Sequence, residues 1–144
     1  MFLLDANVVS ELRKATAGRP DKNVVAWAAG ASAASMFVSV ITLQELEIGV
    51  LLAERRDPPQ GAVLRRWLEE QVLPAFGERM LPVDTAVARR STVLHVPDPR
   101  PIRDSLIAAT ALVHGLSVVT RNVADFAPME VEVIDPWQAA DDPT

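Results

Sequence analysis

Four acidic residues could act together, because each of them stands just after a short apolar run or near the start of a predicted helix. They are Asp5, Glu45, Asp104 and Asp125. If the apolar runs are parallel strands, their carboxyl ends meet at one edge of a sheet and the four side chains converge in one cleft. Four negative charges in one cleft repel one another unless a cation neutralises them. Mg²⁺ or Mn²⁺ prefers such oxygen ligands and supports hydrolysis of phosphodiesters, so the pattern indicates that chemistry.

Each carboxylate also has an ordinary structural explanation. Asp5 could cap the helix that follows it, and Asp104 could simply complement a helix N-terminus. The segment 42–45 (TLQE) matches a capping box, in which Glu45 bonds back to the first residue of its helix. Asp125 could be a turn residue. Taken singly, these explanations suffice, and only the joint pattern favours a common cleft.

The elements that must position the four acids alternate between short apolar strands and helices. Strands are predicted over residues 2–4, 36–41, 80–83, 117–120 and 131–134. Helices are predicted over residues 7–14, 42–56, 62–76, 85–94 and 102–114, with a further helix opening at 20–21, a break at 57–61 and Gly115 as a C-cap. This alternation predicts an α/β protein with three layers, α/β/α, and a mainly parallel sheet of about five strands covered by helices.

Four motifs carry most of this pattern, and they occur in order along nearly the whole chain. They are the segments 4–12 (LDANVVSEL), 40–49 (VITLQELEIG), 103–112 (RDSLIAATAL) and 119–126 (VTRNVADF), followed by 135–137 (DPW). As a set they resemble the PIN-domain ribonucleases of the VapC toxin family, and in particular its FitB-like branch. The resemblance implies a single PIN domain over residues 1–139, followed by a short, frayed acidic tail over 140–144.

The resemblance also implies an activity and partners. A VapC-like protein is a Mg²⁺-dependent endoribonuclease, with Mn²⁺ as a plausible substitute, and the toxin of a type II toxin–antitoxin pair. It forms a homodimer, and a small antitoxin of the VapB or FitA kind neutralises it by covering the site with its C-terminal segment. We therefore expect metal-activated water to attack an RNA phosphodiester and to leave a 3′-hydroxyl and a 5′-phosphate.

Site residues follow from the resemblance position by position. The catalytic, metal-binding quartet is Asp5, Glu45, Asp104 and Asp125, with Asp125 further from the ion than the others. Polar residues expected to support it are Asn7, Thr120 and Asn122. One departure is Ala6, where the family usually has a hydroxyl residue. Loss of that hydroxyl would remove a supporting hydrogen bond and lower activity without abolishing metal binding.

Several residues near the motifs have two explanations. Arginines that could contact RNA phosphates, or could equally be ordinary surface ion-pairing groups, are Arg100, Arg103 and Arg121. Glu47 lies two residues from Glu45 and therefore faces away from it on a helix, as a solvent- or partner-facing charge. Gly49 costs its helix about 1 kcal/mol relative to Ala, which a close helix approach or a binding groove would explain. The helices over 42–56 and 62–76 are expected to be walls for an antitoxin helix.

Composition excludes several other classes. The chain of 144 residues has the size of one domain, and without cysteine it can have no disulfide, cysteine-ligated zinc or cysteine nucleophile. No apolar run reaches ~18 residues and no signal peptide begins the chain, so we expect no membrane segment and a cytoplasmic location. The net charge of −5 argues against nonspecific coating of nucleic acid, but not against a nuclease whose acids hold cations.

Three rival interpretations can be compared with this one, and the sequence argues against the first two. A phosphoacceptor domain also gathers carboxylates around Mg²⁺, but its resemblance requires a lysine after a later strand, and no lysine follows Lys22. A Rossmann nucleotide binder would need a glycine-rich loop after the first strand, which is absent. The third alternative is a PIN-fold RNA- or protein-binding module that is weakly active or inactive, and Ala6 is the one feature that favours it.

Overall fold

The sheet at the centre of the molecule has five parallel strands in the order β3-β2-β1-β4-β5. The computed structural model describes residues 1–139, and for Thr16 and Ala17 only the backbone, so the tail predicted over 140–144 lies outside the described residues. The strands are β1 (Phe2–Leu4), β2 (Met36–Ser39), β3 (Met80–Leu81), β4 (Ser117–Val119) and β5 (Val133–Ile134). Since all five run the same way, their carboxyl ends share one edge of the sheet.

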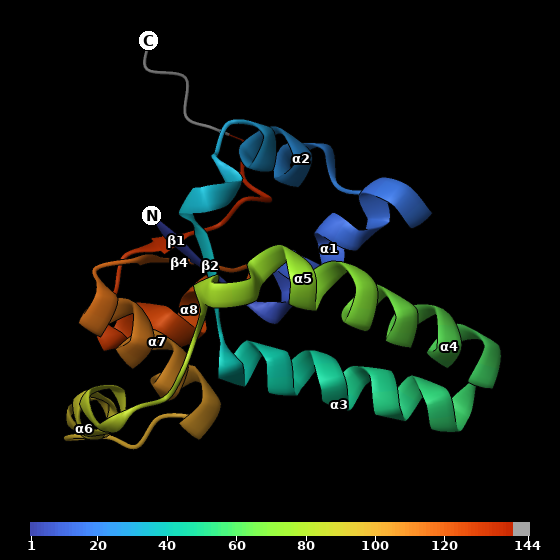
Figure 1. Ribbon diagram of the computed structural model, residues 1–144. Helices are drawn as coiled ribbons and strands as arrows, with labels where there is room; N and C mark the ends of the chain where they lie inside the picture. The colour runs from blue at the N-terminus through green and yellow to red at the C-terminus, as the bar shows by residue number, and fades with distance from the viewer. Residues whose placement is uncertain (140–144) are drawn as a thin grey trace, which may run out of the picture.

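Helices cover both faces of this sheet, and the predicted three-layer α/β fold is confirmed (Figure 1). They are α1 (Ala6–Ala17), α2 (Lys22–Ala29), α3 (Val40–Arg56), α4 (Pro58–Trp67), α5 (Leu73–Phe76), α6 (Thr85–Leu94), α7 (Ile102–His114) and α8 (Val123–Phe126). A π-helical turn over Leu68–Val72 joins α4 to α5, and short 3₁₀ turns span Ala33–Ser35, Gly77–Arg79 and Ala127–Met129.

Two neighbouring leucines of β1 show how the layers are held together. Successive side chains of a strand point to opposite faces, so Leu3 and Leu4 belong to different cores although both are fully buried. Leu3 packs with α6, α7 and α8 on one face, and Leu4 packs with α1, α3 and the segment from α4 to α5 on the other. Burial of each such side chain contributes about 1.5–3 kcal/mol to folding.

Helix α3 begins earlier than predicted, and the capping box proposed for residues 42–45 is wrong. Strand β2 ends at Ser39, whose hydroxyl oxygen accepts a hydrogen bond from the backbone N–H of Ile41 at 3.0 Å and caps the helix. Thr42 is completely buried, and its hydroxyl donates to the carbonyl oxygen of Leu4 at 3.5 Å. Glu45 therefore lies in the second turn of α3, where its carboxylate has no capping role.

The break predicted over residues 57–61 is a sharp corner rather than a loop. Asp57 ends α3 and caps α4, accepting a hydrogen bond from the backbone N–H of Gln60, and Pro58 occupies the first helical position, where its missing N–H is harmless. Gly61 is buried, and a Cβ on it would overlap the backbone of Glu54. Helices α3 and α4 therefore lie side by side as a tight antiparallel arm (Figure 1).

The remaining elements agree in part with the predictions, which did not include the short helix α8. Helices α6 and α7 have the predicted bounds, and Gly115 caps α7 in the left-handed conformation, with φ at 68°. Strands β3 and β5 are shorter than predicted, with two residues each, although the carbonyl oxygen of Glu132, next to β5, still accepts a hydrogen bond from Val118 of β4 at 2.8 Å. Within residues 1–139, no helix has the length and apolar character that a membrane span needs.

Candidate metal site and its surroundings

Asp5 stands between the end of β1 and the first turn of α1, and it is only 5% exposed. Its Oδ1 accepts a hydrogen bond from the backbone N–H of Ala6 at 2.9 Å, as a helix cap does. Its Oδ2 accepts from the hydroxyl of Thr120 at 2.8 Å and from the amide of Asn7 at 3.5 Å. Burial raises the pKa of Asp5, and the hydrogen bonds from Thr120 and Ala6 offset part of this rise. The cap and the buried site carboxylate are therefore the same residue.

A small polar network ties the loop after β1 to the loop after β4. The fully buried Thr120 hydroxyl donates to Asp5 and accepts from the backbone N–H of Asn122 at 3.0 Å and from the amide of Asn7 at 3.2 Å. The amide oxygen of Asn7 in turn accepts from the backbone N–H of Arg121 at 3.2 Å. Asn7 and Thr120 thus support Asp5 through their side chains, whereas Asn122 contributes its backbone.

Glu45 of α3 and Asp104 of α7 both interact electrostatically with Asp5. Both are partly buried, and burial is the main reason that the pKa values of both carboxyls are raised. The charge of Asp5 raises each of them further, as does the charge of Asp104 on Glu45 and that of Asp125 on Asp104. Arg103 lowers the pKa of Glu45, but less than these effects raise it.

Asp125 is the outermost of the four acids. It lies in α8, it is exposed, and its charge acts on both Asp5 and Asp104. The four acids follow β1 or belong to α3, α7 and α8, and each interacts electrostatically with at least one of the others. In the part of the chain that the structure describes, none of them forms an ion pair with Lys or Arg.

The donor set suits a hard divalent cation, although its oxygens do not surround one point. Across residues 1–139, no group of three acidic, histidine or cysteine side chains is close enough to hold an ion by itself. Mg²⁺ commonly takes only one or two carboxylates and completes its shell with water and substrate phosphate. Asp5, held by hydrogen bonds on both oxygens, and Asp104 are the residues that could provide those carboxylates.

The three arginines named as RNA contacts have different surroundings. Arg103 is exposed beside Glu45, close to the acids. The guanidinium of Arg121 lies 5.1 Å from the ring centre of Trp137, so part of its charge is engaged in a cation–π contact. Arg100 donates its backbone N–H to Nδ1 of His95 at 3.1 Å, and its side-chain Nε is buried without a hydrogen-bond partner.

No sequence pattern indicates the hydrogen-bonded chain that lies next to Asp104. His95 accepts at Nδ1 from Arg100, which leaves Nε2–H to donate to the hydroxyl of Ser105 at 3.1 Å. Ser105 in turn donates to the carbonyl oxygen of Ile102 at 2.7 Å. This chain ties the loop after α6 to the first turn of α7, which carries Asp104. In the sequence the signal was limited to Ser105 itself, a serine directly after the motif acid Asp104.

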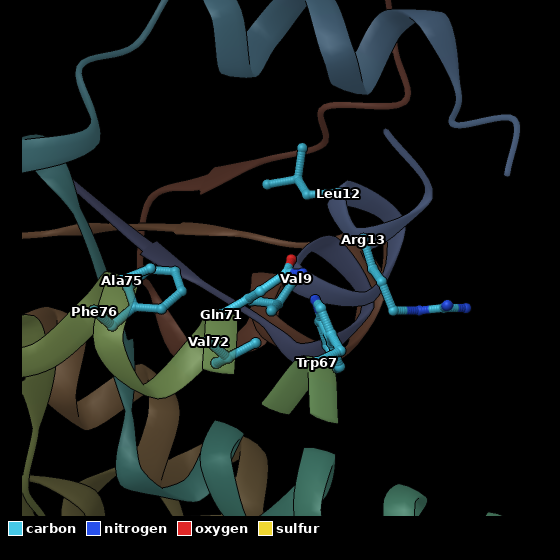
Figure 2. A pocket seen from close by; sticks show the side chains of 8 residues that line it. All are labelled: Val9, Leu12, Arg13, Trp67, Gln71, Val72, Ala75 and Phe76. Atoms are coloured by element: carbon cyan, nitrogen blue, oxygen red, sulfur yellow. The ribbon is translucent and has the colours of Figure 1, made fainter. Parts of the chain in front are cut away.

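Two hollows border Trp67, and one of them is also lined by Glu45. The first, which we call the Gly49 hollow, has a volume of ≈ 360 Å³ and is lined by Ala6, Asn7, Ser10, Arg13, Glu45, Leu46, Gly49, Val50, Leu64 and Trp67. The second, the apolar hollow of Figure 2, has ≈ 180 Å³ between α1 and the segment from α4 to α5 and is lined by Val9, Leu12, Arg13, Trp67, Gln71, Val72, Ala75 and Phe76. Trp67 and Arg13 border both.

Comparison with known proteins defines the class. The family model of the PIN domain matches residues 2–128. The chain is 35% identical to the VapC ribonuclease Y4jK of Sinorhizobium fredii, over 97% of this chain and 100% of the relative, and 37% identical to the toxin FitB of Neisseria gonorrhoeae, over 95% and 99%. The chain therefore belongs to the PIN-domain family, in the branch that contains the VapC ribonucleases and FitB, and the resemblance noted in its motifs is confirmed.

Solved structures agree with this assignment. The crystal structure of FitAcB from Neisseria gonorrhoeae superposes with a TM-score of 0.85 at 35% identity, over 95% of this chain and 99% of the other. The structure of FitAB bound to an IR36 DNA fragment gives 0.87 at 32% identity, over 98% and 99%. Nearly the whole chain therefore adopts the fold of these proteins.

Proposed function

We propose that this protein is a metal-dependent endoribonuclease that acts as the toxin of a toxin–antitoxin pair. The observation that carries the proposal is the group of Asp5, Glu45 and Asp104, whose pKa values are all raised and which have no cationic ion-pair partner in residues 1–139. Perturbed carboxylates gathered at one strand edge are typical of a functional site. Similarity along the whole chain to proteins named VapC ribonuclease supports the same reaction.

Each acid has a distinct part in this proposal. Asp5 and Asp104 would hold Mg²⁺ or Mn²⁺, Glu45 would bind it directly or through water and orient the attacking water, and Asp125 would act from further out. When bound, the ion would make water a stronger nucleophile and offset the charge on the leaving oxygen. Thr120 and Asn7 keep Asp5 in one orientation by donating to its Oδ2. The products would carry a 3′-hydroxyl and a 5′-phosphate.

An inactive binding module is the alternative, and Ala6 was the reason for it. Ala6 removes a side-chain hydroxyl, but its backbone N–H still donates to Asp5, and the Thr120 hydroxyl donates to the other carboxylate oxygen. Asp5 therefore keeps donors on both oxygens. This geometry favours the active enzyme over the binding module.

The test is cleavage of total cellular RNA by purified protein without antitoxin, with Mg²⁺, with Mn²⁺ and with EDTA. Asp5→Asn and Asp104→Asn are compared with Glu54→Gln, a matched change on α3 away from the site. We expect cleavage that requires metal, is lost in the two site variants and persists in Glu54→Gln. Cleavage that survives EDTA and both site substitutions would come from a contaminant, and a folded wild type that never cleaves RNA would support the binding module.

A small antitoxin is the proposed protein partner, because the similar solved structures include a toxin–antitoxin complex from Klebsiella pneumoniae. The apolar hollow of Figure 2, between α1 and the segment from α4 to α5, offers it a site for apolar side chains. The test is Leu12→Asp, which places a charge in that hollow. We expect it to reduce inhibition by the co-expressed antitoxin while metal-dependent cleavage stays intact, whereas unchanged inhibition would place the antitoxin elsewhere.

The proposal also includes a homodimer and a cytoplasmic location, as expected for such a toxin. Light scattering of the purified chain, alone and with antitoxin, measures the assembly. Fractionation of cells that carry the tagged, inactive Asp104→Asn protein measures the location. A monomer at all concentrations, or recovery with membranes, would contradict these two parts without affecting the nuclease itself.

A further inference from the structure

Two helical glycines on the α3–α4 arm differ in what their missing side chains permit. Gly61 is required by packing, because a Cβ there would overlap the backbone of Glu54. Gly49 has no such reason, since a Cβ built on it meets nothing within 4 Å. A glycine inside a helix lowers stability relative to alanine, so its presence needs a reason. Of the two explanations open for Gly49, a close helix approach is therefore wrong, and a binding groove remains.

The space that Gly49 leaves open belongs to the Gly49 hollow beside the acids. Glu45, one turn before Gly49 on α3, lines the same hollow, as does Asn7, which donates to Asp5. A polynucleotide whose phosphodiester lies at Asp5 and Asp104 must place the neighbouring nucleoside within a few ångströms of that phosphate. The Gly49 hollow is such a neighbouring space.

The walls of the hollow suit a flat, uncharged, partly polar group. Trp67 offers an aromatic surface, and the guanidinium of Arg13 lies 5.9 Å from the centre of its ring. Apolar side chains of α3 and α4 surround the space, and Asn7 and Ser10 of α1 add polar atoms. Glu45 disfavours a phosphate inside the hollow. Bases of single-stranded RNA are recognised by this combination of stacking and a few hydrogen bonds.

We propose that the Gly49 hollow binds one unpaired nucleobase of the RNA, next to the cleaved phosphodiester, and so determines a base preference at that position. The inference rests on the proposed nuclease function. The net charge of −5 favours this mode, because an acidic protein gains little from phosphate neutralisation and needs contacts to bases. Gly49 keeps the hollow open, and Trp67 provides its stacking surface.

The first test fills the hollow without disturbing the metal site. Gly49→Leu adds a side chain to open space and improves helix propensity, so the protein should fold and its melting temperature should not fall. The control is Ala62→Leu, at an exposed position of α4. New RNA ends are sequenced after cleavage of total RNA by each protein. We expect kcat/KM to fall roughly tenfold or more and the base preference at one flanking position to disappear in Gly49→Leu only.

A second readout does not depend on turnover. In the Asp104→Asn background, a short single-stranded RNA of random sequence should quench the emission of Trp67, and the quenching should disappear in Trp67→Phe and decrease in Gly49→Leu. The same RNA made without bases should not quench. Calorimetric Mn²⁺ titration of Gly49→Leu, with Asp104 intact, should match that of the wild type, which separates the hollow from the metal site.

The possible results separate this inference from the proposed function. If the wild type cleaves RNA and Gly49→Leu cleaves it equally, with the same base preference, the inference is wrong and the nuclease stands. If Gly49→Leu keeps full cleavage but escapes inhibition, the hollow holds an antitoxin side chain instead. If the wild type never cleaves, quenching of Trp67 that requires bases and an open hollow still supports the base site, and its absence overturns both proposals.

Discussion

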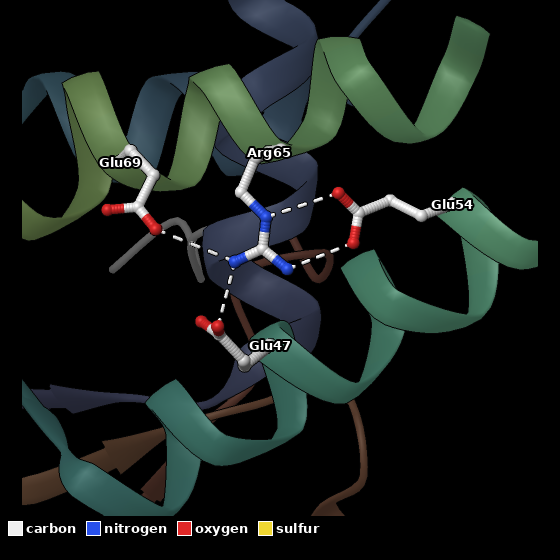
Figure 3. A network of polar contacts seen from close by, with 4 residues as sticks. All are labelled: Glu47, Glu54, Arg65 and Glu69. Atoms are coloured by element: carbon white, nitrogen blue, oxygen red, sulfur yellow. Dashed lines mark hydrogen bonds and ion pairs between the residues drawn. The ribbon is translucent and has the colours of Figure 1, made fainter. Parts of the chain in front are cut away.

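Helix α3 takes part in two groups of carboxylates that the protein treats in opposite ways. At its first turns, Glu45 joins Asp5 and Asp104 at the sheet edge, where the pKa of each is raised. Further along, Glu47 and Glu54 join Glu69 around a single arginine. Figure 3 shows this arginine, Arg65 of α4, reaching all three of those glutamates.

In the arginine group, each of the three glutamates reaches the same cation, Arg65. Arg65 donates to both oxygens of Glu54, at 3.3 and 3.0 Å, and to Glu47 at 2.7 Å, and it lies 3.5 Å from Glu69. The hydrogen bonds from Arg65 lower the pKa of Glu54, whereas burial and the charges of Asp5 and Asp104 raise that of Glu45. The difference is that the arginine group contains a cation that all its acids reach, while the acids at the sheet edge have no ion pair with Lys or Arg in residues 1–139 and are left for an added cation.

The largest expected effect is the loss of RNA cleavage when Glu45, in the group at the sheet edge, is replaced by glutamine. The same replacement in the arginine group, at Glu54, is its control. Glu45→Gln should lower RNA cleavage by roughly a hundredfold or more, because it removes a carboxylate from the metal site. It should also raise the melting temperature without metal at neutral pH, because an acid with a raised pKa destabilises the folded state once it is ionised.

Glu54→Gln is the matched control for this prediction. It should leave cleavage unchanged and slightly lower the melting temperature, because the pKa of Glu54 is lowered in the folded state. Cleavage rates and thermal unfolding of both variants check the comparison. If both substitutions shift stability in the same direction, the two groups do not differ in the way described.

The next prediction concerns how the stability of the folded protein depends on pH and on bound metal. The stability of the metal-free protein should fall as pH rises from the ordinary carboxyl range through the raised pKa values of Asp5, Glu45 and Asp104, because the unfolded chain loses those protons first. Mn²⁺ should reverse this loss at neutral pH, by about 2.7 kcal/mol at a hundred times its Kd, and should stabilise less as pH falls. Thermal unfolding with and without Mn²⁺ measures both trends, and a metal effect that grows on acidification would contradict them.

The two groups also differ in how far they could be predicted from the sequence. The positions of Asp5 and Asp104 could be predicted from the sequence, because the end of the first strand and the helix over 102–114 are local patterns. Together these patterns place both residues at one edge of the sheet. The start of α3 was not, since Ser39 and Thr42 are both good caps and only the tertiary contact of Thr42 with Leu4 decides between them.

The features that could not be predicted depend on contacts between segments that are distant in the sequence. Arg65 lies on α4 and Glu47 on α3, on opposite sides of the turn at Asp57. Their pairing depends on the close approach of the two helices that Gly61 allows. The link from His95 to Ser105 likewise joins two helices through a loop whose path no local pattern predicts. The π-helical turn over Leu68–Val72 looked like ordinary helix, because it keeps the apolar spacing of one.

A smaller effect on stability is expected from substitutions in the arm formed by α3 and α4, which carries the arginine group. Gly61→Ala should destabilise the protein by about 1–3 kcal/mol, because the added methyl group meets the backbone of Glu54 and forces α4 outward. Gly49→Ala, the same change one helix earlier, should instead stabilise by up to about 1 kcal/mol. Chemical denaturation of both variants measures the difference. Equal effects would mean that the two helices are not in close contact at Gly61.

The smallest expected effect tests the arginine group alone. Arg65→Gln leaves three glutamates without their cation, and the melting temperature should fall by a few degrees at low salt, because half-exposed ion pairs contribute modestly. The loss should shrink in high salt, which screens the repulsion among the glutamates, while cleavage stays at the wild-type level. Thermal unfolding across a salt series measures this. If the loss is the same at every salt concentration, the stem of Arg65 stabilises the arm by packing, and its charge is not what distinguishes this group from the metal site.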